Sequence, residues 1–467
     1  MLSAYYQITP ASLSSNSRLF IGNIQALVVL FVLCFPDIRI LLLKGQIAML
    51  KNYTYQYSLI WNSCSVQLPE FPRAYSISEK LAKEVFLDQF LESIKSFRIQ
   101  RMKKIPLTDF DERLFFENTR VFLREGLDFT DCQLEMMFSE ELIDVTRKFV
   151  RQARQFDPDL SFHDIFQACR NVWIMNGLQL IMGLPMQVTP SIFAYSLLYP
   201  YTDNLIDDPR ISDFDKMIFS ERFRQRLSGE KPEASTQTEH AIFHLVEMIE
   251  DQYSRVDFPE VFESLLCIHE AQTNSLKLIH SKDSISEKET LNICLAKGGA
   301  SVLADGFLVA GKLTETQKYF LFGYGAYLQL LDDIQDLEED QLAGLMTVFS
   351  STTFHSTLDE KLNKTYWFGD QVMKSLDFFD GQHIDLFKSL MRRSMDLFIA
   401  EAIAQNPDFY SPKYVADFET GSPFHFSYIR KRKEQFTPYN GFLLTAIEEI
   451  AFAENFRNEK KRTILTD

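Results

Sequence analysis

Residues 329–340 have the sequence QLLDDIQDLEED, and this stretch does most to decide the fold and the chemistry. Six of the nine residues from position 332 to 340 are acidic, and no Lys or Arg lies between Lys318 and Lys361. At about 100° per residue, the apolar residues share one helix face: Leu330, Ile334 and Leu337. The carboxylates spread over the opposite flank: Asp332, Asp333, Asp336 and Asp340. Solvated helix faces usually mix both signs of charge, so the pattern favours a metal-binding helix over a merely solvated acidic one.

A second acidic group lies earlier in the chain, where residues 201–209 have the sequence YTDNLIDDP. Asp203 and Asp207 are one helical turn apart, with Asp208 beside them. Pro209 is expected to end the helix, because proline disfavours helical backbone in the residue before it. The carboxylates then crowd a helix C-terminus, where the helix dipole is already negative. A bound cation would remove this repulsion, although a solvated helix end is an equal alternative.

The chain as a whole is expected to be helical. It is low in turn residues, with 17 Gly and 16 Pro in 467 residues, and its 42 Phe imply either an aromatic-walled cavity or a Phe-packed core. Apolar spacings of three and four predict helices over these ranges: 78–97, 140–156, 162–183, 189–208, 239–256, 259–279, 286–311, 314–349 and 378–405. Thr189-Pro190 is a good helix start, and residues 228–238 form the clearest loop. We therefore expect an all-α protein with one large helical domain over residues 76–467.

The N-terminal residues 1–75 differ from the rest and are expected to form an extension outside this domain. Residues 19–35 are almost continuously apolar, followed by a second short apolar stretch at 40–43. A membrane-spanning helix needs about 20 apolar residues, so the length is marginal. Three alternatives remain for this region: a membrane-associated segment at 19–43, a buried helix, or an extension upstream of a true start at Met49.

Composition and spacing exclude several classes of function. The net charge of −16 argues against a nucleic-acid partner, which requires basic patches. The six cysteines are scattered without a Cys-x-x-Cys pair, and no Glu-x-x-His pair occurs. These absences argue against a zinc knuckle, a disulfide framework and a di-iron site. A metal here would be held by oxygen ligands.

The two acidic groups are expected to act together. Asp203 and Asp332 are 129 residues apart, which leaves room for about five helices between them. Two carboxylate-rich helices that face each other across a bundle would form an oxygen-lined opening. Mg²⁺ prefers such carboxylates and commonly completes its coordination with substrate phosphates.

These motifs resemble those of the class I isoprenoid synthases. Gly325-x-x-x-Gln329-Leu-x-Asp-Asp-Ile-x-Asp336 resembles the second aspartate-rich motif of that superfamily, and Leu337-x-Glu339-Asp340 is similar to the ending seen in squalene and phytoene synthases. Asp203-Asn-Leu-Ile-Asp207 resembles the first motif of those enzymes, and residues 201–205 resemble a stretch of the bacterial large terpene synthases. The order and separation of the motifs suit the family across residues 150–440.

The resemblance implies an all-α bundle of the isoprenoid synthase type with a central apolar cavity. It implies several Mg²⁺ ions held by the carboxylates of both motifs: Asp203, Asp207, Asp208, Asp332, Asp333, Asp336 and Asp340. Among these, Asp203, Asp207 and Asp336 are expected to be essential for catalysis. The substrate implied is a prenyl diphosphate, whose leaving group is stabilised by metal ions and cationic side chains.

Four residues are candidate diphosphate ligands: Arg170, Lys297, Tyr428 and Arg430. Lys297 precedes Gly298 and Gly299, which are expected to interrupt a helix and expose backbone to a cavity. The alternative for Lys297 is a surface lysine beside a packing glycine pair. The alternative for Arg430 is a solvated basic run over residues 430–433.

One difference from the family's motifs argues against a chain-elongating prenyltransferase. The first motif is followed by Pro209-Arg210-Ile211-Ser212 and lacks the Arg-Arg-Gly of chain-elongating prenyltransferases. We therefore expect a cytoplasmic Mg²⁺-dependent terpene synthase that ionises a long-chain prenyl diphosphate and then cyclises or eliminates, with peripheral membrane association as a further possibility. The alternatives are a head-to-head prenyl transferase of the squalene or phytoene synthase type and a catalytically inactive helical binding protein.

Overall fold

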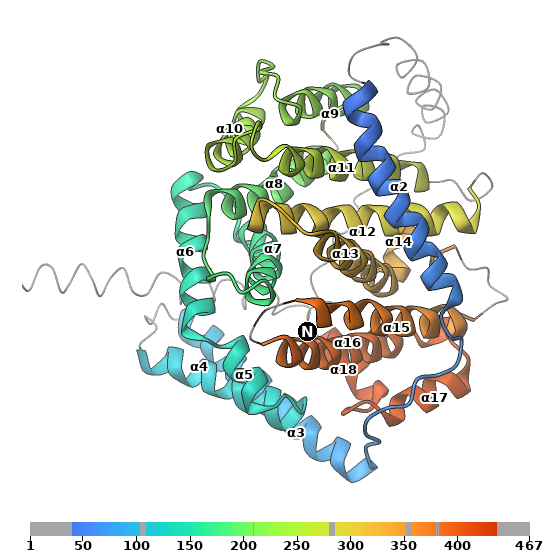
Figure 1. Cartoon of the computed structure of the whole chain (residues 1–467). Coiled ribbons are helices and arrows are strands. Elements are labelled where there is room, and N and C mark those ends of the chain that lie inside the picture. The colour runs from blue at the N-terminus through green and yellow to red at the C-terminus, as the bar shows by residue number, and fades with distance from the viewer. Residues whose placement is uncertain are drawn as a thin grey trace, which may run out of the picture.

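Helices form all the regular secondary structure in the described part of the chain, apart from one isolated β-bridge between Ile279 and Leu345. The computed structural model describes residues 40–102, 109–208, 210–279, 285–351, 357–379, 381 and 383–436. Figure 1 shows α12 and α13 in the middle of the molecule, with α2 crossing them. The all-α class predicted from the sequence is confirmed for the described residues.

The helices follow one another with mostly short connections. In the first part of the chain they are α2 (Ile40–Ser63), α3 (Ile77–Met102), α4 (Asp109–Val121), α5 (Asp131–Met137), α6 (Glu140–Phe156), α7 (Phe162–Ile181) and α8 (Pro190–Asp207). In the middle they are α9 (Asp213–Leu227), α10 (Gln237–Gln252), α11 (Pro259–Ser275), α12 (Glu287–Ala310), α13 (Glu315–Gln335) and α14 (Leu337–Ala343). At the end they are α15 (Asp359–Lys374), α16 (Ile384–Gln405), α17 (Pro412–Thr420) and α18 (Phe426–Phe436). A π-helical turn covers Phe122–Gly126, and 3-10 turns cover Leu276–Leu278, Ser375–Phe378 and Pro407–Phe409.

Side-chain caps fix several helix starts. The Thr189 hydroxyl accepts a hydrogen bond from the Ile192 backbone N–H at 3.3 Å, with Pro190 in the first turn of α8. This confirms the start predicted from Thr189-Pro190. The predicted helix over 140–156 is also confirmed, as α6.

The predicted helix over 314–349 is too long. α13 ends at Gln335, where Asp336 has φ −89° and ψ 13°, and α14 then continues to Ala343. Gly344 follows with φ 71°, a left-handed conformation that ends helices and favours glycine. The acidic motif therefore spans the junction of two helices.

Residues 49–63 belong to the main core, contrary to the expectation that everything before residue 76 lies outside the fold. The Tyr57 side chain is 1% exposed and its hydroxyl donates to the Tyr319 carbonyl oxygen on α13 at 2.7 Å. The Trp61 indole donates to the Thr365 hydroxyl on α15 at 3.3 Å. Of the apolar segment at 19–43, residues 19–39 lie outside the described residues.

α12 and α13 pack unusually closely through glycine. A Cβ added at Gly298 would lie 2.3 Å from the Gly325 carbonyl oxygen, and one at Gly299 would lie 2.6 Å from the Phe322 ring. α12 runs without interruption through both positions. The expectation that these glycines break the helix and open onto a cavity is therefore wrong, because the missing side chains are what allow the two backbones to touch.

The interior is packed with aromatic side chains, which fits the Phe-packed alternative. Several Phe side chains have less than 2% of their surface exposed: Phe149, Phe307, Phe320, Phe322, Phe349, Phe368 and Phe426. A smaller cluster centred on Phe90 and Phe122 lies beneath α3. Within the described residues, α12 is the one helix long and apolar enough to cross a membrane, and 83% of its most apolar window is buried by the rest of the protein. α12 is therefore a core helix of the bundle.

Candidate metal and diphosphate site

The antiparallel packing of α12 and α13 positions the second acidic motif. Gly306 of α12 contacts Leu321 of α13, and Gly298 contacts Gly325. Continuing this register brings the C-terminal end of α13 beside the N-terminal half of α12. The acidic motif therefore lies next to the part of α12 that carries Lys297.

Three carboxylates of the motif follow one another by single helical turns. The Asp336 N–H donates to the Asp332 carbonyl oxygen at 2.9 Å, and the Asp340 N–H donates to the Asp336 carbonyl oxygen at 2.8 Å. Side chains four residues apart share one helix surface at about 5–6 Å between Cβ atoms. The apolar residues of the other face, Leu330, Ile334 and Leu337, are each at most 1% exposed, as the spacing predicted.

The environment opposes ionisation of these carboxylates. Burial, then repulsion from Asp332, raises the pKa of Asp336 to about 7. Burial, then repulsion from Asp333 and Asp336, raises the pKa of Asp340 to about 8. Such carboxylates gain more from a bound cation than exposed ones do, because a cation removes both the repulsion and the desolvation penalty.

The charges of two cations from other helices act on the motif. Burial raises the pKa of Asp332, while the charges of Lys297 on α12 and Arg170 on α7 act in the opposite direction. Lys297 likewise favours ionisation of Asp340, and Arg170 favours ionisation of Asp336. The fold thus supplies counter-charge that is absent from the motif's own stretch of sequence.

Asp333 differs from its neighbours. Its Oδ1 accepts a hydrogen bond from the Gln329 side chain at 2.8 Å, and its side chain faces the Cys294 thiol of α12. Asp333 is 4% exposed, and burial raises its pKa to about 6. Its carboxyl therefore lies between α12 and α13, still close enough for its charge to raise the pKa values of Asp336 and Asp340.

The first motif lies at the end of α8, next to the start of α7. The Asn204 side chain donates to Asp164 of α7 at 3.1 Å, and the Tyr201 hydroxyl donates to Asp157 at 2.5 Å. α7 therefore carries both Asp164, which contacts the first motif, and Arg170, whose charge acts on the second motif. Asp203 is half-buried at this end of α8.

The other two carboxylates of the first motif, Asp207 and Asp208, give no support to a metal site. Asp208, where α8 has ended as predicted, has extended backbone with ψ 113°. Its carboxylate accepts from the Arg210 guanidinium at 2.7 and 2.9 Å, and these hydrogen bonds lower its pKa to about 2. Asp208 is thus engaged in an ion pair, and the Asp207 side chain lies outside the described residues.

Tyr428 and Arg430 are held in a different part of the fold. The Tyr428 hydroxyl donates to the Glu84 carbonyl oxygen at 2.9 Å and to Asp88 at 2.5 Å, both on α3. The Arg430 guanidinium donates to the Ala404 carbonyl oxygen near the end of α16 at 3.0 Å. These contacts attach α18 to α3 and α16, and they account for both side chains without a diphosphate.

The donor chemistry of α13 suits Mg²⁺. Carboxylate oxygens on successive turns are hard ligands, and the unfavourable ionisation of Asp336 and Asp340 is what a divalent ion would relieve. Among the side chains that the structure describes, no group of three or more Asp, Glu, His or Cys residues is already arranged around one metal position. Binding a metal would therefore require these carboxylates to converge by rotation about their side-chain bonds.

A buried polar group that the sequence patterns did not predict lies deeper in the bundle. Asp305 is 1% exposed, neither of its carboxyl oxygens has a hydrogen-bond partner, and burial raises its pKa to about 8. The Asn171 side chain of α7 lies close enough to lower that pKa, and it donates to the Ser196 hydroxyl of α8 at 3.2 Å. The signal was available: Lys297, Ser301 and Asp305 follow at intervals of four on one helix face.

The likeness to isoprenoid synthases rests on the short stretches at 201–208 and 325–340. Comparison of the chain with protein-family models finds no match, and a search of the curated proteins finds none either.

Proposed function

We propose that this protein is a Mg²⁺-dependent enzyme of the class I terpene synthase type, which ionises a long-chain prenyl diphosphate and then cyclises the product or eliminates a proton. The observation that supports the proposal is that the charges of two cations from separate helices, Lys297 and Arg170, act on the buried carboxylates of the α13 motif. A site with both carboxylates and cations fits a metal–diphosphate complex better than it fits a bare cation or a bare anion.

The acidic residues would bind the metal ions, and the basic residues would bind the diphosphate. Asp332, Asp336 and Asp340 would hold Mg²⁺ from the α13 side, and Asp203 would contribute from the end of α8. Lys297 and Arg170 would bind diphosphate oxygens and orient the ester bond. Bound Mg²⁺ would supply Lewis-acid stabilisation of the diphosphate leaving group.

The remaining requirement is a dry environment for the hydrocarbon chain. The half-buried position of the motif supports this part of the proposal, although the aromatic interior is packed and would have to open to admit a long hydrocarbon chain. Aromatic faces stabilise nearby positive charge through their quadrupoles. Such surroundings would also exclude water from a reactive cation.

The test is incubation of the purified full chain with C15, C20 and C25 prenyl diphosphates and Mg²⁺, with pyrophosphate and the organic extract both measured. Asp336→Asn should abolish pyrophosphate release, whereas Glu338→Gln, at an exposed position two residues away on α14, should leave it within about twofold of wild type. Circular dichroism should show unchanged helix content in both variants.

The products decide between the proposal and its alternatives. A hydrocarbon or alcohol formed from a single diphosphate supports the proposal. An obligatory second prenyl unit would replace it with a head-to-head prenyl transferase. Absence of pyrophosphate release from all three substrates would leave a helical binding protein.

A further inference from the structure

Asp305 of α12 is a buried titratable group to which the proposed function gives no role. Among the buried carboxyl groups in the described part of the chain, it alone lacks a hydrogen-bond partner on both oxygens. Buried polar groups are nearly always hydrogen-bonded, and a catalytic role is one explanation for an exception. Burial of such a group also reduces stability, so packing alone does not explain an aspartate at this position.

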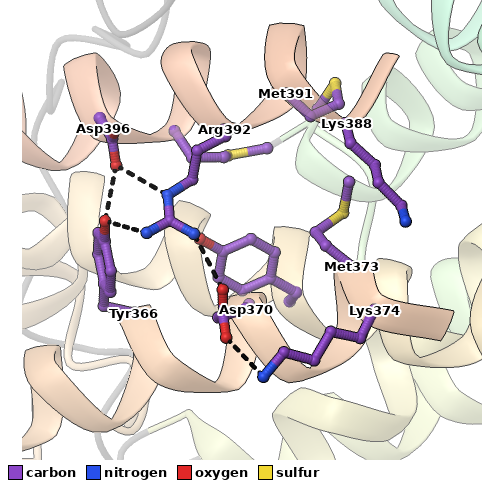
Figure 2. A pocket seen from close by; sticks show the side chains of 11 residues that line it. Tyr366, Asp370, Met373, Lys374, Lys388, Met391, Arg392 and Asp396 are labelled. Atoms are coloured by element: carbon purple, nitrogen blue, oxygen red, sulfur yellow. Dashed lines mark hydrogen bonds and ion pairs between the residues drawn. The ribbon is translucent and has the colours of Figure 1, made fainter. Parts of the chain in front are cut away.

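The carboxyl groups of a pocket elsewhere in the fold show the usual arrangement. A cavity of about 180 Å³ between α13, α15 and α16 has two carboxyl groups in its lining, and both are paired (Figure 2). The Arg392 guanidinium lies 3.0 Å from Asp370 and 3.6 Å from Asp396. These ion pairs account for both carboxyl groups, whereas no ion pair accounts for Asp305.

Asp305 lies on the same face of α12 as Lys297, a proposed diphosphate ligand. Lys297, Ser301 and Asp305 follow one another at intervals of four residues, which places them in a row along one helix face. At 1.5 Å per residue, Asp305 is about 12 Å further along the helix axis than Lys297. A hydrocarbon chain that follows this face from a diphosphate bound at Lys297 leads towards Asp305.

The accessible surface of this helix face ends one turn before Asp305. Lys297 and Ser301 are both half-buried, whereas every residue from Val302 to Val309 is buried. Tyr199 on the neighbouring helix α8 is half-buried as well. Asp305 therefore lies just beneath the end of this accessible surface, where it is shielded from bulk water.

The groups around Asp305 are neutral. The Asn171 side chain of α7 is close enough to lower the pKa of Asp305, but burial dominates and raises that pKa to about 8. Burial, then the charge of Asp305, raises the pKa of Tyr195 on α8, and the Ser301 side chain acts in the opposite direction. Tyr195 is therefore near both Asp305 and Ser301. A carboxyl group whose pKa is close to the working pH is well suited to proton transfer.

We propose that Asp305 is the base that ends the reaction by removing a proton from the carbocation, so that the product is a hydrocarbon and not an alcohol. This inference rests on the proposed function. The diphosphate leaves with the electron pair of the C–O bond. A carboxylate oxygen of Asp305 then takes a proton from a carbon next to the cationic carbon, and the electron pair of that C–H bond forms the new C=C bond. The proton returns to solvent through the hydroxyl groups of Tyr195 and Ser301, of which Ser301 is half-buried.

The test compares the products of wild type, Asp305→Asn and the exposed control Asp385→Asn after incubation with C15, C20 and C25 prenyl diphosphates and Mg²⁺. Gas chromatography measures hydrocarbon and alcohol relative to the pyrophosphate released. Wild type and Asp385→Asn should form mainly hydrocarbon. Asp305→Asn should lower the ratio of hydrocarbon to alcohol at least tenfold, because general bases contribute about 10²–10⁴-fold and water captures a cation that no base deprotonates.

Two results would overturn this inference and leave the proposed function in place. They are pyrophosphate release with the same product mixture in wild type and Asp305→Asn, and an alcohol as the main product of wild type. Absence of pyrophosphate release by wild type would overturn both proposals. If circular dichroism shows that Asp305→Asn is misfolded, Asp305→Ala decides the point, since it removes the carboxyl without leaving a buried polar side chain.

Discussion

Replacement of Asp305 by Asn should stabilise the protein, and the gain should grow with pH. Asp305 is fully buried without a hydrogen-bond partner, and burial raises its pKa from the model-peptide value of 3.8 to about 8. The pKa of Asp305 is higher in the folded than in the unfolded state. The protein is therefore most stable, as far as Asp305 is concerned, below about pH 4, and its free energy of unfolding falls progressively as the pH rises towards 8. Each pKa unit corresponds to about 1.4 kcal/mol, so folding at pH 7 carries a penalty of about 4 kcal/mol, against about 2 kcal/mol at pH 5.

Asn has nearly the same shape as Asp and no charge, so Asp305→Asn removes the pH-dependent part of this penalty. Urea unfolding followed by circular dichroism should show that the advantage of the variant over wild type is about 2–3 kcal/mol larger at pH 7 than at pH 5. Taking the difference between the two pH values cancels any pH-independent effect of the new amide. The exposed Asp385→Asn on α16 serves as the control. An advantage of equal size at both pH values would refute the reasoning.

Three further predictions follow from the packing and the charges. Asp336 and Asp340, whose pKa values are raised to about 7 and about 8, lose their protons as the pH rises through this range, and the folded protein becomes less stable. Because Mg²⁺ binds the ionised carboxylates, it should raise the melting temperature more at pH 8 than at pH 5. Asp336→Asn should diminish that effect. Gly298→Ala should lower the free energy of unfolding by about 1–3 kcal/mol or more in urea titrations, because its Cβ would lie 2.3 Å from the Gly325 carbonyl oxygen; an unchanged midpoint would mean that α12 and α13 are not in this close contact. Tyr57→Ala should destabilise the protein by about 3–5 kcal/mol, as for other buried aromatic residues, whereas the exposed Tyr55→Ala should have little effect; equal effects would place α2 outside the core.

The helical class and several helix limits could be predicted from local patterns. The 3.6-residue periodicity placed Leu330, Ile334 and Leu337 on one buried face, and capping residues marked the start of α8. These features depend on neighbours in the sequence, which is why sequence reasoning reached them.

The predictions that the structure contradicts concern contacts between segments that are distant in the sequence. Gly298 and Gly299 give the same local signal whether they interrupt a helix or let two helices touch, and only the partner Gly325 distinguishes the two. The composition of the N-terminal region predicts an extension outside the fold, yet Tyr57 packs against α13, more than 250 residues later in the chain. In both cases tertiary packing overrides the local pattern.

The candidate site could be predicted only in part, because it too combines a local motif with contacts between distant segments. The sequence shows its carboxylates as a motif and offers Lys297 and Arg170 as candidates, but only the fold shows that the charges of these two cations act on the α13 carboxylates. The pairing of Asp208 with Arg210 is local and could have been noticed from their spacing. Asp305 was not predicted because the four-residue spacing of Lys297, Ser301 and Asp305 does not reveal, without the fold, that this helix position is buried.

The most direct test of the central claim is binding of Mn²⁺, in place of Mg²⁺, together with inorganic pyrophosphate, followed by electron paramagnetic resonance of the free metal ion. If the α13 carboxylates and the cations of α7 and α12 form one site, pyrophosphate should strengthen Mn²⁺ binding by the wild-type chain at least tenfold, and Asp336→Asn and Lys297→Gln should each abolish that coupling. Identical Mn²⁺ binding by wild type, Asp336→Asn and the neighbouring Glu338→Gln, with or without pyrophosphate, would contradict the account.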